Sequence, residues 1–409
     1  MRVVHINCAD FGSTGKIIDD ISKEAYKRNW DSFLFTPFIN EKKSYLNKKA
    51  YCFNHEPGIN RRVAQLLGLR YNFAPFSTQK IFKYLEQVNP DIVHLHAING
   101  NVVNVYKLIN FLKKKSIPMV VTNHSEFFYT GTCTHAYDCE KWKTGCGNCA
   151  DFKSQAQSRF FDRTGTAWKK MKDVFSDYKN ATIVSVSPWV FSRCKDSPIV
   201  AGLQQKMILN GLDTEIFNGL DMAGARERLG LSLNDKYIAY ITTRFNPDDE
   251  KEVKGSSYIV ELAKKLEPHN VKVMVVGVCE KYTTELPSNM IIVGRVMNQK
   301  VLADYYCAAD LSVITSKRET FSMIVAESLC CGTPVLGFKA GGPESIAIQE
   351  YSQFFEYGDI DALYKSIINK WLDFKNQENS KTLSQLAEMQ YNSEKMANEY
   401  LDLYEEMLS

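Results

Sequence analysis

The chain has 409 residues, a length that predicts two domains at roughly 150 residues or more each. Its composition, with 44% hydrophobic and 24% charged residues, is ordinary for a globular protein with sizeable cores and excludes an intrinsically disordered chain. We find no signal-peptide pattern and no apolar stretch of about eighteen residues, so we expect a cytosolic protein. In that compartment the 11 cysteines would be thiols, metal ligands or nucleophiles rather than a disulfide framework.

The net charge of +3 conceals a difference between the two parts of the chain. Residues 1–203 carry 29 Lys and Arg against 17 Asp and Glu, or +12, whereas residues 204–409 carry 21 against 30, or −9. A basic half predicts an anionic partner, such as a membrane surface, a phosphorylated substrate or nucleic acid. Solvated lysines without a partner are the alternative.

Short apolar runs alternate with longer amphipathic runs along the whole chain. The short runs are rich in β-branched residues and predict buried strands. They cover residues 2–7, 31–37, 91–97, 118–124, 181–187, 236–244, 271–277, 289–294, 310–316 and 334–338. Helical patterns lie between them, for example over residues 16–29 and 102–115. This alternation predicts two α/β domains, each with a doubly wound parallel sheet.

A turn signal, Asn-Gly, places the domain boundary near residues 203–212. We therefore expect an N-terminal domain over residues 1–203 and a C-terminal domain over residues 204–379. Residues 380–409 alternate charged and apolar positions and predict a C-terminal helix that packs back toward the N-terminal domain.

Two glutamates, Glu319 and Glu327, interrupt the apolar run of residues 318–335. Glu319 follows a predicted strand and precedes a helix, whose first backbone N–H groups suit a phosphate. Those groups belong to Phe321, Ser322 and Met323. The two carboxylates could then contact opposite ends of a nucleotide-sugar. In the alternative interpretation Glu319 stabilises the helix dipole and Glu327 is the buried partner of an arginine.

This run resembles the E-x7-E signature of family 4 glycosyltransferases, which are retaining enzymes with the two-domain GT-B architecture. Three further motifs follow the order of that family. They are Asn210-Gly211-Leu212-Asp213, Arg244 with Lys254-Gly255, and Gly341-Gly342-Pro343-Glu344. The resemblance spans nearly the whole chain and implies two Rossmann-like domains facing across a cleft.

The resemblance also implies a donor site in the C-terminal domain. Arg244 and Lys254 would neutralise the donor diphosphate, so that no catalytic metal is expected. Glu327 would bind the ribose hydroxyls, and Glu319 would orient the donor sugar. Gly255 would also belong to this site. Arg295 and Val296 would lie beside the base. Phe321, Ser322 and Met323 would complete the site at the start of the helix. Asp359 and Asp361 superficially match a metal-binding motif, but they open a helical segment and predict a helix cap.

His124 resembles the family histidine that approaches the donor sugar from the acceptor domain. With Glu319, Arg244 and Lys254 it completes the expected catalytic set. The turn Gly12-Ser13-Thr14-Gly15 fails the Walker A pattern and would instead line the acceptor side. His94 and His96 alternate with apolar residues in one predicted strand. We expect them to point to opposite faces, as structural residues or with one of them lining the cleft.

The loop over residues 131–149 departs from the general family pattern. Cys133, Cys139, Cys146 and Cys149 are separated by five, six and two residues, which favours a closed structural zinc site. Free or disulfide-linked thiols are the alternative, and His135 could replace one ligand. The loop is similar to insertions in colanic-acid-type bacterial polysaccharide transferases and would cover the acceptor.

The implied reaction transfers a hexosyl unit, with retention, from a nucleoside-diphosphate sugar to a hydroxyl group of a lipid-linked saccharide in bacterial surface polysaccharide synthesis. UDP-sugars are favoured over GDP-sugars. Lys113 to Lys115, with Arg61 and Arg62, would suit peripheral contact with the anionic inner face of the cytoplasmic membrane. No nucleic acid is expected. The alternatives are a catalytically silent nucleotide-sugar-binding partner in an assembly complex and a GT-B-fold sugar-nucleotide epimerase.

Overall fold

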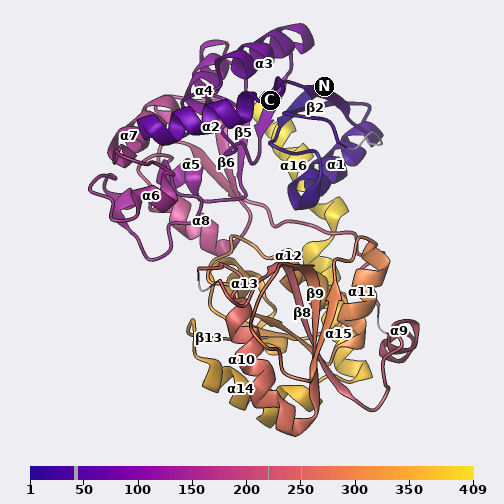
Figure 1. Ribbon diagram of the computed structural model, residues 1–409. Coiled ribbons are helices and arrows are strands. Elements are labelled where there is room, and N and C mark those ends of the chain that lie inside the picture. Colours follow the sequence, from indigo (N-terminus) through magenta and orange to yellow (C-terminus); the bar gives the residue numbers. More distant parts are fainter. Residues whose placement is uncertain (41–44, 220, 250) are drawn as a thin grey trace. The chain divides into compact units, whose positions relative to one another are not determined.

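The computed structural model describes residues 1–40, 45–219, 221–249 and 251–409. Its chain divides into two compact units, one formed by Met1–Gly211 with Ser393–Ser409 and the other by Leu212–Asn392 (Figure 1). From the sequence we placed these divisions at residues 203 and 379. The first boundary lies later because strand β7 (Gln204–Met207) pairs with β6 (Ala181–Ser185) in the first sheet.

The first unit is built on a parallel sheet with the strand order β3-β2-β1-β4-β5-β6-β7 among the described residues. Besides β6 and β7, its strands are β1 (Arg2–Ile6), β2 (Asp31–Thr36), β3 (Asn47–Ala50), β4 (Ile92–Leu95) and β5 (Met119–Asn123). The order reverses between β1 and β4, so the loops that follow these two strands meet at a topological switch point.

Helices cover both faces of this sheet. They are α1 (Gly12–Lys27), α2 (Glu56–Leu67), α3 (Pro75–Val88), α4 (Val105–Lys114), α5 (Phe127–Thr130), α6 (Phe152–Gln155), α7 (Thr164–Phe175), α8 (Pro188–Lys195) and α16 (Ser393–Leu408), with the 3₁₀ helix η1 (Lys141–Lys143). Helix α16 packs beside α1, and its Tyr400, Leu401 and Tyr404 are fully buried in the core of this unit (Figure 1).

The second unit has a parallel sheet with the order β10-β9-β8-β11-β12-β13 among the described residues. Its strands are β8 (Lys236–Phe245), β9 (Val271–Cys279), β10 (Met290–Gly294), β11 (Leu311–Ile314), β12 (Val335–Phe338) and β13 (Ser352–Phe355). Here the order reverses between β8 and β11, which therefore form the switch point of this sheet. All ten predicted strands are confirmed, each within about two residues of its predicted bounds.

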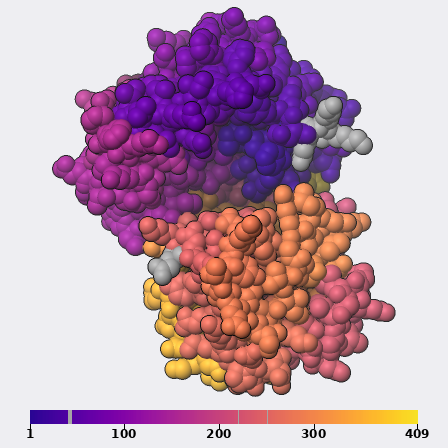
Figure 2. Space-filling view, viewed as in Figure 1, coloured from indigo at the N-terminus to yellow at the C-terminus, as the bar shows by residue number. Residues whose placement is uncertain are grey.

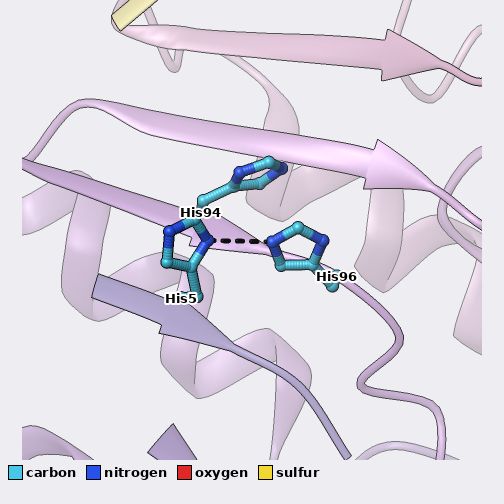
Figure 3. Close-up of side chains that lie close together, drawn as sticks. All are labelled: His5, His94 and His96. Atoms are coloured by element: carbon cyan, nitrogen blue, oxygen red, sulfur yellow. Dashed lines mark hydrogen bonds between the residues drawn. The ribbon is translucent and has the colours of Figure 1, made fainter. Parts of the chain in front are cut away.

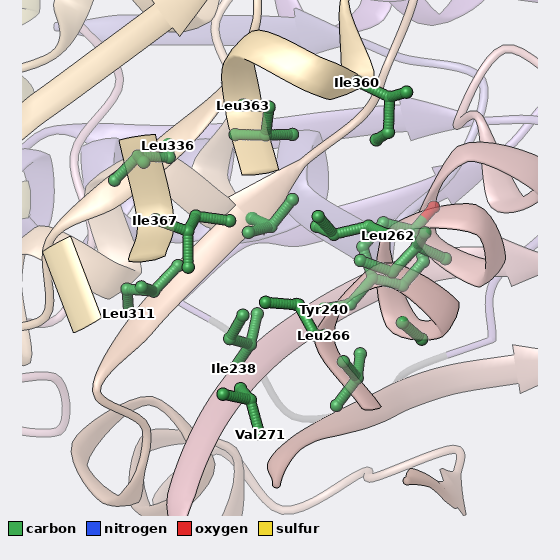
Figure 4. Packing of buried hydrophobic residues seen from close by; sticks show 14 of the residues in the cluster. Ile238, Tyr240, Leu262, Leu266, Val271, Leu311, Leu336, Ile360, Leu363 and Ile367 are labelled. Carbon is green, nitrogen blue, oxygen red and sulfur yellow. The ribbon is translucent and has the colours of Figure 1, made fainter. Parts of the chain in front are cut away.

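The helices of the second unit are α9 (Met222–Arg228), α10 (Ser256–Leu266), α11 (Gln299–Ala308), α12 (Met323–Cys330), α13 (Gly342–Ile346), α14 (Ile360–Asn369) and α15 (Gln377–Tyr391), with the 3₁₀ helices η2 (Glu267–His269), η3 (Gln349–Tyr351) and η4 (Trp371–Asp373). Leucine and isoleucine side chains of α10 and α14 pack on β8, β11 and β12 (Figure 4). Asp359 caps α14, because its Oδ1 accepts a hydrogen bond from Ala362 N at 3.0 Å, which confirms the predicted cap.

The single helix predicted over residues 380–409 is wrong, because the chain forms two helices there. Asn392 is extended, with φ −62° and ψ 127°, and pairs with Leu212 in an isolated bridge. Helix α15 stays with the second unit and only α16 belongs to the first. Among the described residues, no helix combines the length and apolar character that crossing a bilayer requires.

The packing of α16 predicts the effect of shortening one buried side chain. Leu401 is fully buried, whereas Leu408 on the same helix is 43% exposed. We expect Leu401→Ala to lower the free energy of unfolding by about 2–5 kcal/mol. Leu408→Ala, the matched control, should change it by less than about 0.5 kcal/mol. Urea unfolding measures both, and equal losses would contradict the burial of Leu401 in this core.

Candidate functional site

Two predicted residues, Lys254 and Glu319, meet at the switch point of the second sheet. Lys254 follows β8 and Glu319 follows β11, and these two strands are neighbours. Lys254 Nζ lies 2.9 Å from Glu319 Oε1, and Ser316 Oγ donates a hydrogen bond to the same oxygen at 2.6 Å. A cation and a carboxylate therefore lie together at the edge of the sheet where open α/β folds bind ligands.

The carboxylate of Glu319 is charged although its side chain is only 10% exposed. Burial raises its pKa. The positive charge of Lys254 and the hydrogen bond from Ser316 together lower the pKa by more than burial raises it, so that it lies below its ordinary value. An ionised carboxylate accepts hydrogen bonds and cannot donate one. Glu319 is therefore suited to orient hydroxyl groups and the lysine ammonium.

The backbone on both sides of this pair is fixed by close contacts. The carbonyl of Lys254 accepts hydrogen bonds from Tyr240 Oη at 2.9 Å and Thr315 Oγ1 at 2.8 Å. Gly255 has φ 72°, and a Cβ atom there would lie 2.3 Å from the carbonyl oxygen of Thr315. Only glycine fits this position, which explains the Lys-Gly pair.

The Gly-Gly-Pro-Glu turn supports the loop that carries Glu319. Glu319 N donates to Ala340 O at 3.0 Å, and Gly342 N donates to Glu319 O at 2.9 Å. A Cβ atom at Gly342 would lie 2.5 Å from Phe321 N. The carboxylate of Glu344 closes the turn by accepting from Ala340 N and Gly341 N. Residues 340–344 thus hold the backbone of the Glu319 loop in place.

The start of α12 holds the predicted phosphate-binding N–H groups in a strained arrangement. Ser322, its N-cap, has φ 84° and ψ 92°, a conformation that costs a non-glycine residue about 1–3 kcal/mol. Phe321 is 3% exposed, and its ring meets that of Tyr391 edge to face. Met323 is the first helical residue. Backbone strain of this kind occurs preferentially at ligand-binding and active sites.

Glu327 lies within α12, and Tyr306 of α11 holds its side chain in place. Tyr306 Oη donates to Glu327 Oε2 at 2.7 Å. Burial and the nearby charge of Glu327 raise the pKa of Tyr306 well above its ordinary value, so the phenol stays protonated and keeps donating. The sequence had pointed to an arginine as the alternative partner of this glutamate, not to a tyrosine.

Arg244, at the end of β8, is paired with carboxylates. Its Nε and one terminal nitrogen each lie 2.8 Å from an oxygen of Glu280, and its other terminal nitrogen lies 3.2 Å from Asp249. The Arg244 side chain is 42% exposed, so water screens these pairs and they contribute little to stability. Glu280 was missed by sequence reasoning, although it directly follows strand β9, where the functional edge of the sheet begins.

Arg295 and Val296 follow β10, the edge strand of the sheet. Arg295 is exposed and Val296 partly buried. Strand β10 is two places from β8, so these residues lie about 10 Å to one side of the strand that leads to Lys254. The structure therefore does not join them to the Lys254–Glu319 pair by direct contact, and their place beside a base stays a prediction.

In the first unit, residues Gly12–Gly15, predicted as a strand-to-helix turn, form the first turn of helix α1, which follows β1 at the switch point. A Cβ atom at Gly15 would lie 2.9 Å from the carbonyl carbon of Asp10, so the turn requires glycine there. Asn7 was not singled out by the sequence. Its side chain donates to Ala9 O and Thr14 Oγ1 and accepts from Ala97 N at 3.1 Å, which ties together the loops after β1 and β4. Ser13 lies in the first turn of α1.

Three buried imidazoles, those of His5, His94 and His96, form a cluster with the partly buried His124 beside this switch point. His5 Nδ1 lies 3.1 Å from His96 Nε2 (Figure 3), and His96 Nδ1 lies 3.2 Å from His124 Nε2. The rings of His94 and His96 have centroids 3.8 Å apart. The expectation that these two point to opposite faces is wrong, because residues two apart in a strand share a face.

Burial keeps these imidazoles neutral. It lowers the pKa of His5 to about 3 and that of His124 to about 4, and it lowers those of His94 and His96 well below the ordinary value. His5, His94 and His96 are the one group among the described residues whose metal-ligating atoms lie within 4.8 Å of one another. Hydrogen bonds to Tyr404 Oη and Thr122 Oγ1 already engage both nitrogens of His94.

The four cysteines of residues 131–149 are free thiols in one neighbourhood. Burial, followed by the proximity of Cys139 and Cys149, raises the pKa of Cys146 to about 12. Among the described residues no three of these sulfur atoms lie within 4.8 Å of one another, whereas a four-thiolate zinc site holds each sulfur about 2.3 Å from the metal. His135 Nδ1 lies 4.0 Å from Glu126. The zinc site stays a prediction.

The histidine cluster predicts a loss of stability in acid. Because the folded pKa values lie below the ordinary 6.5, the unfolded chain binds more protons below about pH 6.5 and is favoured as the pH falls. Each histidine should contribute a slope approaching about 1.4 kcal/mol per pH unit between pH 6 and 4. Denaturant unfolding at several pH values measures this. His5→Asn should reduce the slope by the contribution of one histidine, about 1.4 kcal/mol per pH unit. An unchanged slope would contradict burial of His5 as the cause.

Comparison with known proteins agrees with this geometry. Residues 228–390 match the family model described as glycosyl transferases group 1. The chain is 25% identical to N-acetyl-alpha-D-glucosaminyl L-malate synthase of Bacillus anthracis, over 49% of this chain and 53% of that protein. It is 30% identical to D-inositol 3-phosphate glycosyltransferase of Thermomonospora curvata, over 41% of this chain and 43% of that protein. The chain thus spans about half the length of these two curated relatives.

A longer match joins the chain to the putative colanic acid biosynthesis glycosyl transferase WcaC of Escherichia coli, at 20% identity over 78% of this chain and 77% of that protein. Among solved structures, sucrose-phosphate synthase from Thermosynechococcus elongatus aligns with a TM-score of 0.71 at 16% identity, covering 100% of this chain and 99% of the other. Anabaena Alr3699/HepE in complex with UDP aligns with a TM-score of 0.67 at 15% identity, covering 99% and 100%. The chain therefore has the two-domain GT-B fold, and its residues 228–390 match the model of the glycosyl transferases group 1 family.

Proposed function

We propose that the protein is a retaining glycosyltransferase that moves a hexosyl unit from a nucleoside-diphosphate sugar to a hydroxyl group of a lipid-linked saccharide. The observation that carries this proposal is the Lys254–Glu319 pair at the switch point of the second sheet. UDP-sugars are the favoured donors, because the Anabaena protein of the same fold was crystallised with UDP and with UDP-glucose. The similarity to WcaC supports a role in surface polysaccharide synthesis.

In this proposal the diphosphate of the donor replaces carboxylates as the binding partner of two cations. Lys254 turns from Glu319 toward a phosphate oxygen, and Arg244 exchanges Glu280 for another. A diphosphate carries more charge than a single carboxylate and accepts hydrogen bonds from both cations, so the exchange is favourable. The two cations and the N–H groups at the start of α12 then supply the positive charge that the leaving diphosphate needs. No divalent ion is required for this role.

The chemical step retains the configuration of the anomeric carbon. The bond from that carbon to the diphosphate oxygen breaks, a bond to the acceptor oxygen forms on the same face, and the acceptor proton moves to the departing diphosphate oxygen. The positive charge around the diphosphate lowers the barrier to its departure. Glu319 orients the sugar and Lys254, and Glu327, held by Tyr306, accepts hydrogen bonds from ribose hydroxyls. His124, a neutral imidazole of the first unit, is the proposed contact to a sugar hydroxyl.

We also propose that the protein contacts the anionic inner face of the cytoplasmic membrane peripherally. Arg61 and Arg62 of α2 are exposed and suit this role. The lysines at the end of α4 are less suited, since Lys113 Nζ bonds Ser176 O and Lys115 pairs with Glu86 at 3.6 Å. The basic surface therefore centres on α2 more than on α4.

Nucleotide binding tests the proposed function. UDP should raise the melting temperature of the protein, and GDP should raise it less. Lys254→Ala should weaken UDP binding at least about tenfold, because it removes a charge-assisted hydrogen bond to phosphate. Lys251→Ala, an exposed lysine of the same loop, is the matched control and should bind as the wild type does. Failure of every nucleotide to shift the melting temperature would refute the proposal, and UDP binding without turnover of any UDP-sugar would favour the silent binding partner.

Glu280 should act as a competitor of the donor for Arg244. Replacing it by Gln removes its charge and frees the guanidinium, so we expect Glu280→Gln to bind UDP about two- to fivefold more tightly. Glu285→Gln, an exposed glutamate in the same segment, is the control and should leave affinity unchanged. Isothermal titration calorimetry at low ionic strength measures both variants. Weaker binding by Glu280→Gln would show that Glu280 positions Arg244 for the donor and does not compete for it.

A further inference from the structure

An apolar pocket of about 580 Å³ lies between α2 and α3 of the first unit. This volume falls within the range of about 300–1,000 Å³ typical of small-molecule sites. Its apolar walls come from Phe53, Ile59, Val63, Phe73, Pro75 and Phe76. The side chains of Phe53, Ile59 and Phe76 are 54%, 58% and 68% exposed, which is unusual for large apolar groups that serve only to fill a core.

The pocket lies at the functional edge of the first sheet. Phe53 belongs to the connection that leaves the carboxyl end of β3 and leads into α2. The neighbouring Cys52 Sγ donates to Val102 O at 3.9 Å, and Tyr71 N donates to Asn101 Oδ1 at 3.5 Å. These contacts join the pocket walls to the loop after β4, at the switch point where the acceptor side was predicted. Helices α2 and α3 are labelled in the upper part of Figure 1 and contribute the purple surface there in Figure 2.

Two polar residues of the lining differ in their hydrogen bonding. The carboxylate of Glu56 is satisfied, because it accepts hydrogen bonds from the backbone N–H and the hydroxyl of Ser77. Asn60 is 5% exposed, and its side-chain nitrogen has no hydrogen-bond partner among the described residues. A buried amide donor without an acceptor is unfavourable. An oxygen atom of a bound molecule would satisfy it.

The surroundings of the pocket are basic. Residues 53–84 contain five Lys and Arg and a single acidic residue, Glu56. Lys80 Nζ lies 5.0 Å from the ring centre of Phe53, which places a cation beside the apolar wall. Apolar walls, the unpaired buried amide donor of Asn60 and the nearby ammonium of Lys80 are complementary to an amphiphile with a hydrocarbon chain and an anionic head.

We propose that this pocket binds the hydrocarbon chain of the phosphate-bearing lipid to which the acceptor saccharide is attached. The chain occupies the apolar space between α2 and α3, an oxygen next to the chain accepts from Asn60, and the phosphate lies near Lys80. This inference rests on the proposed function, since it names the part of the acceptor that the first unit holds. It also explains why apolar side chains are exposed at this edge.

Calorimetric titration of the full chain with decyl phosphate, below its micellar concentration, tests the pocket. We expect saturable binding of one molecule per chain. Phe76→Asp should weaken it at least about tenfold, because a carboxylate is poorly accommodated against a hydrocarbon chain. The matched control is Phe160→Asp, since Phe160 is 64% exposed but lies outside the pocket, and it should bind within about twofold of the wild type. Equal weakening by the two variants, or no saturable binding, overturns the proposal.

Asn60→Leu provides a readout that misfolding would not imitate. It removes an unpaired buried donor, so the melting temperature of the lipid-free protein should rise while decyl phosphate binds about fivefold more weakly. A lower melting temperature with unchanged affinity would contradict the role of Asn60. Inorganic phosphate and the uncharged dodecyl maltoside should each bind more weakly than decyl phosphate. Binding to phosphatidylglycerol vesicles that is lost in Phe76→Asp, together with no binding of decyl phosphate by the wild type, would assign this surface to the membrane and overturn the pocket.

The UDP-induced shift in melting temperature, measured on the same samples, separates this proposal from the proposed function. Loss of decyl phosphate binding in Phe76→Asp with an unchanged UDP shift supports the pocket. Absence of decyl phosphate binding in the wild type beside a normal UDP shift overturns the pocket alone. A missing UDP shift beside normal decyl phosphate binding overturns the proposed function alone.

Discussion

The ion pair between Lys254 and Glu319 is the interaction on which the account of the second unit depends. It exists because the connections that follow two neighbouring parallel strands, β8 and β11, lead to opposite sides of the sheet and so open a space at the carboxyl ends of these strands. Each partner is held by its own loop, one requiring glycine at position 255 and the other resting on the turn at residues 340–344. Backbone contacts therefore fix the positions from which the two charged side chains extend.

A site of this kind holds its cations ready at little energetic cost. Arg244 and Glu280 are both partly exposed, so exchanging this carboxylate for a phosphate loses little. Glu319 stays ionised because Lys254 and Ser316 compensate its burial. When Lys254 turns toward a diphosphate, hydroxyl groups of the sugar can donate hydrogen bonds to Glu319 in its place, and Ser316 keeps its own hydrogen bond. Lys254 would thus bind the diphosphate, and Glu319 would then orient the sugar.

Apolar patterning predicted ten of the strands in the described residues, because strands covered on both faces must be continuously apolar and the edge strand β10 is itself an apolar run. It missed the edge strands β3, β7 and β13, because each has only four residues and none is a continuous apolar run: their sequences are Asn-Lys-Lys-Ala, Gln-Gln-Lys-Met and Ser-Gln-Phe-Phe. It also missed the break at Asn392, which no proline or glycine announces. In the candidate site, Glu319, Lys254 and Gly255 were predicted from their places after strands and from the family resemblance. Glu280 and Asn7 were not, because a single polar residue after a strand has no distinctive pattern, and the pairing of Glu280 with Arg244 is a tertiary contact.

The central claim is that Lys254, at the switch point of the second sheet, receives the diphosphate of a nucleotide-sugar donor. The most direct measurement is a crystal structure of the protein with UDP. We predict a phosphate oxygen within about 3.2 Å of Lys254 Nζ, with the lysine turned away from Glu319 and the N–H groups at the start of α12 directed at the same diphosphate. The account would be contradicted by a structure in which UDP is bound elsewhere and Lys254 still contacts Glu319 as it does without the nucleotide.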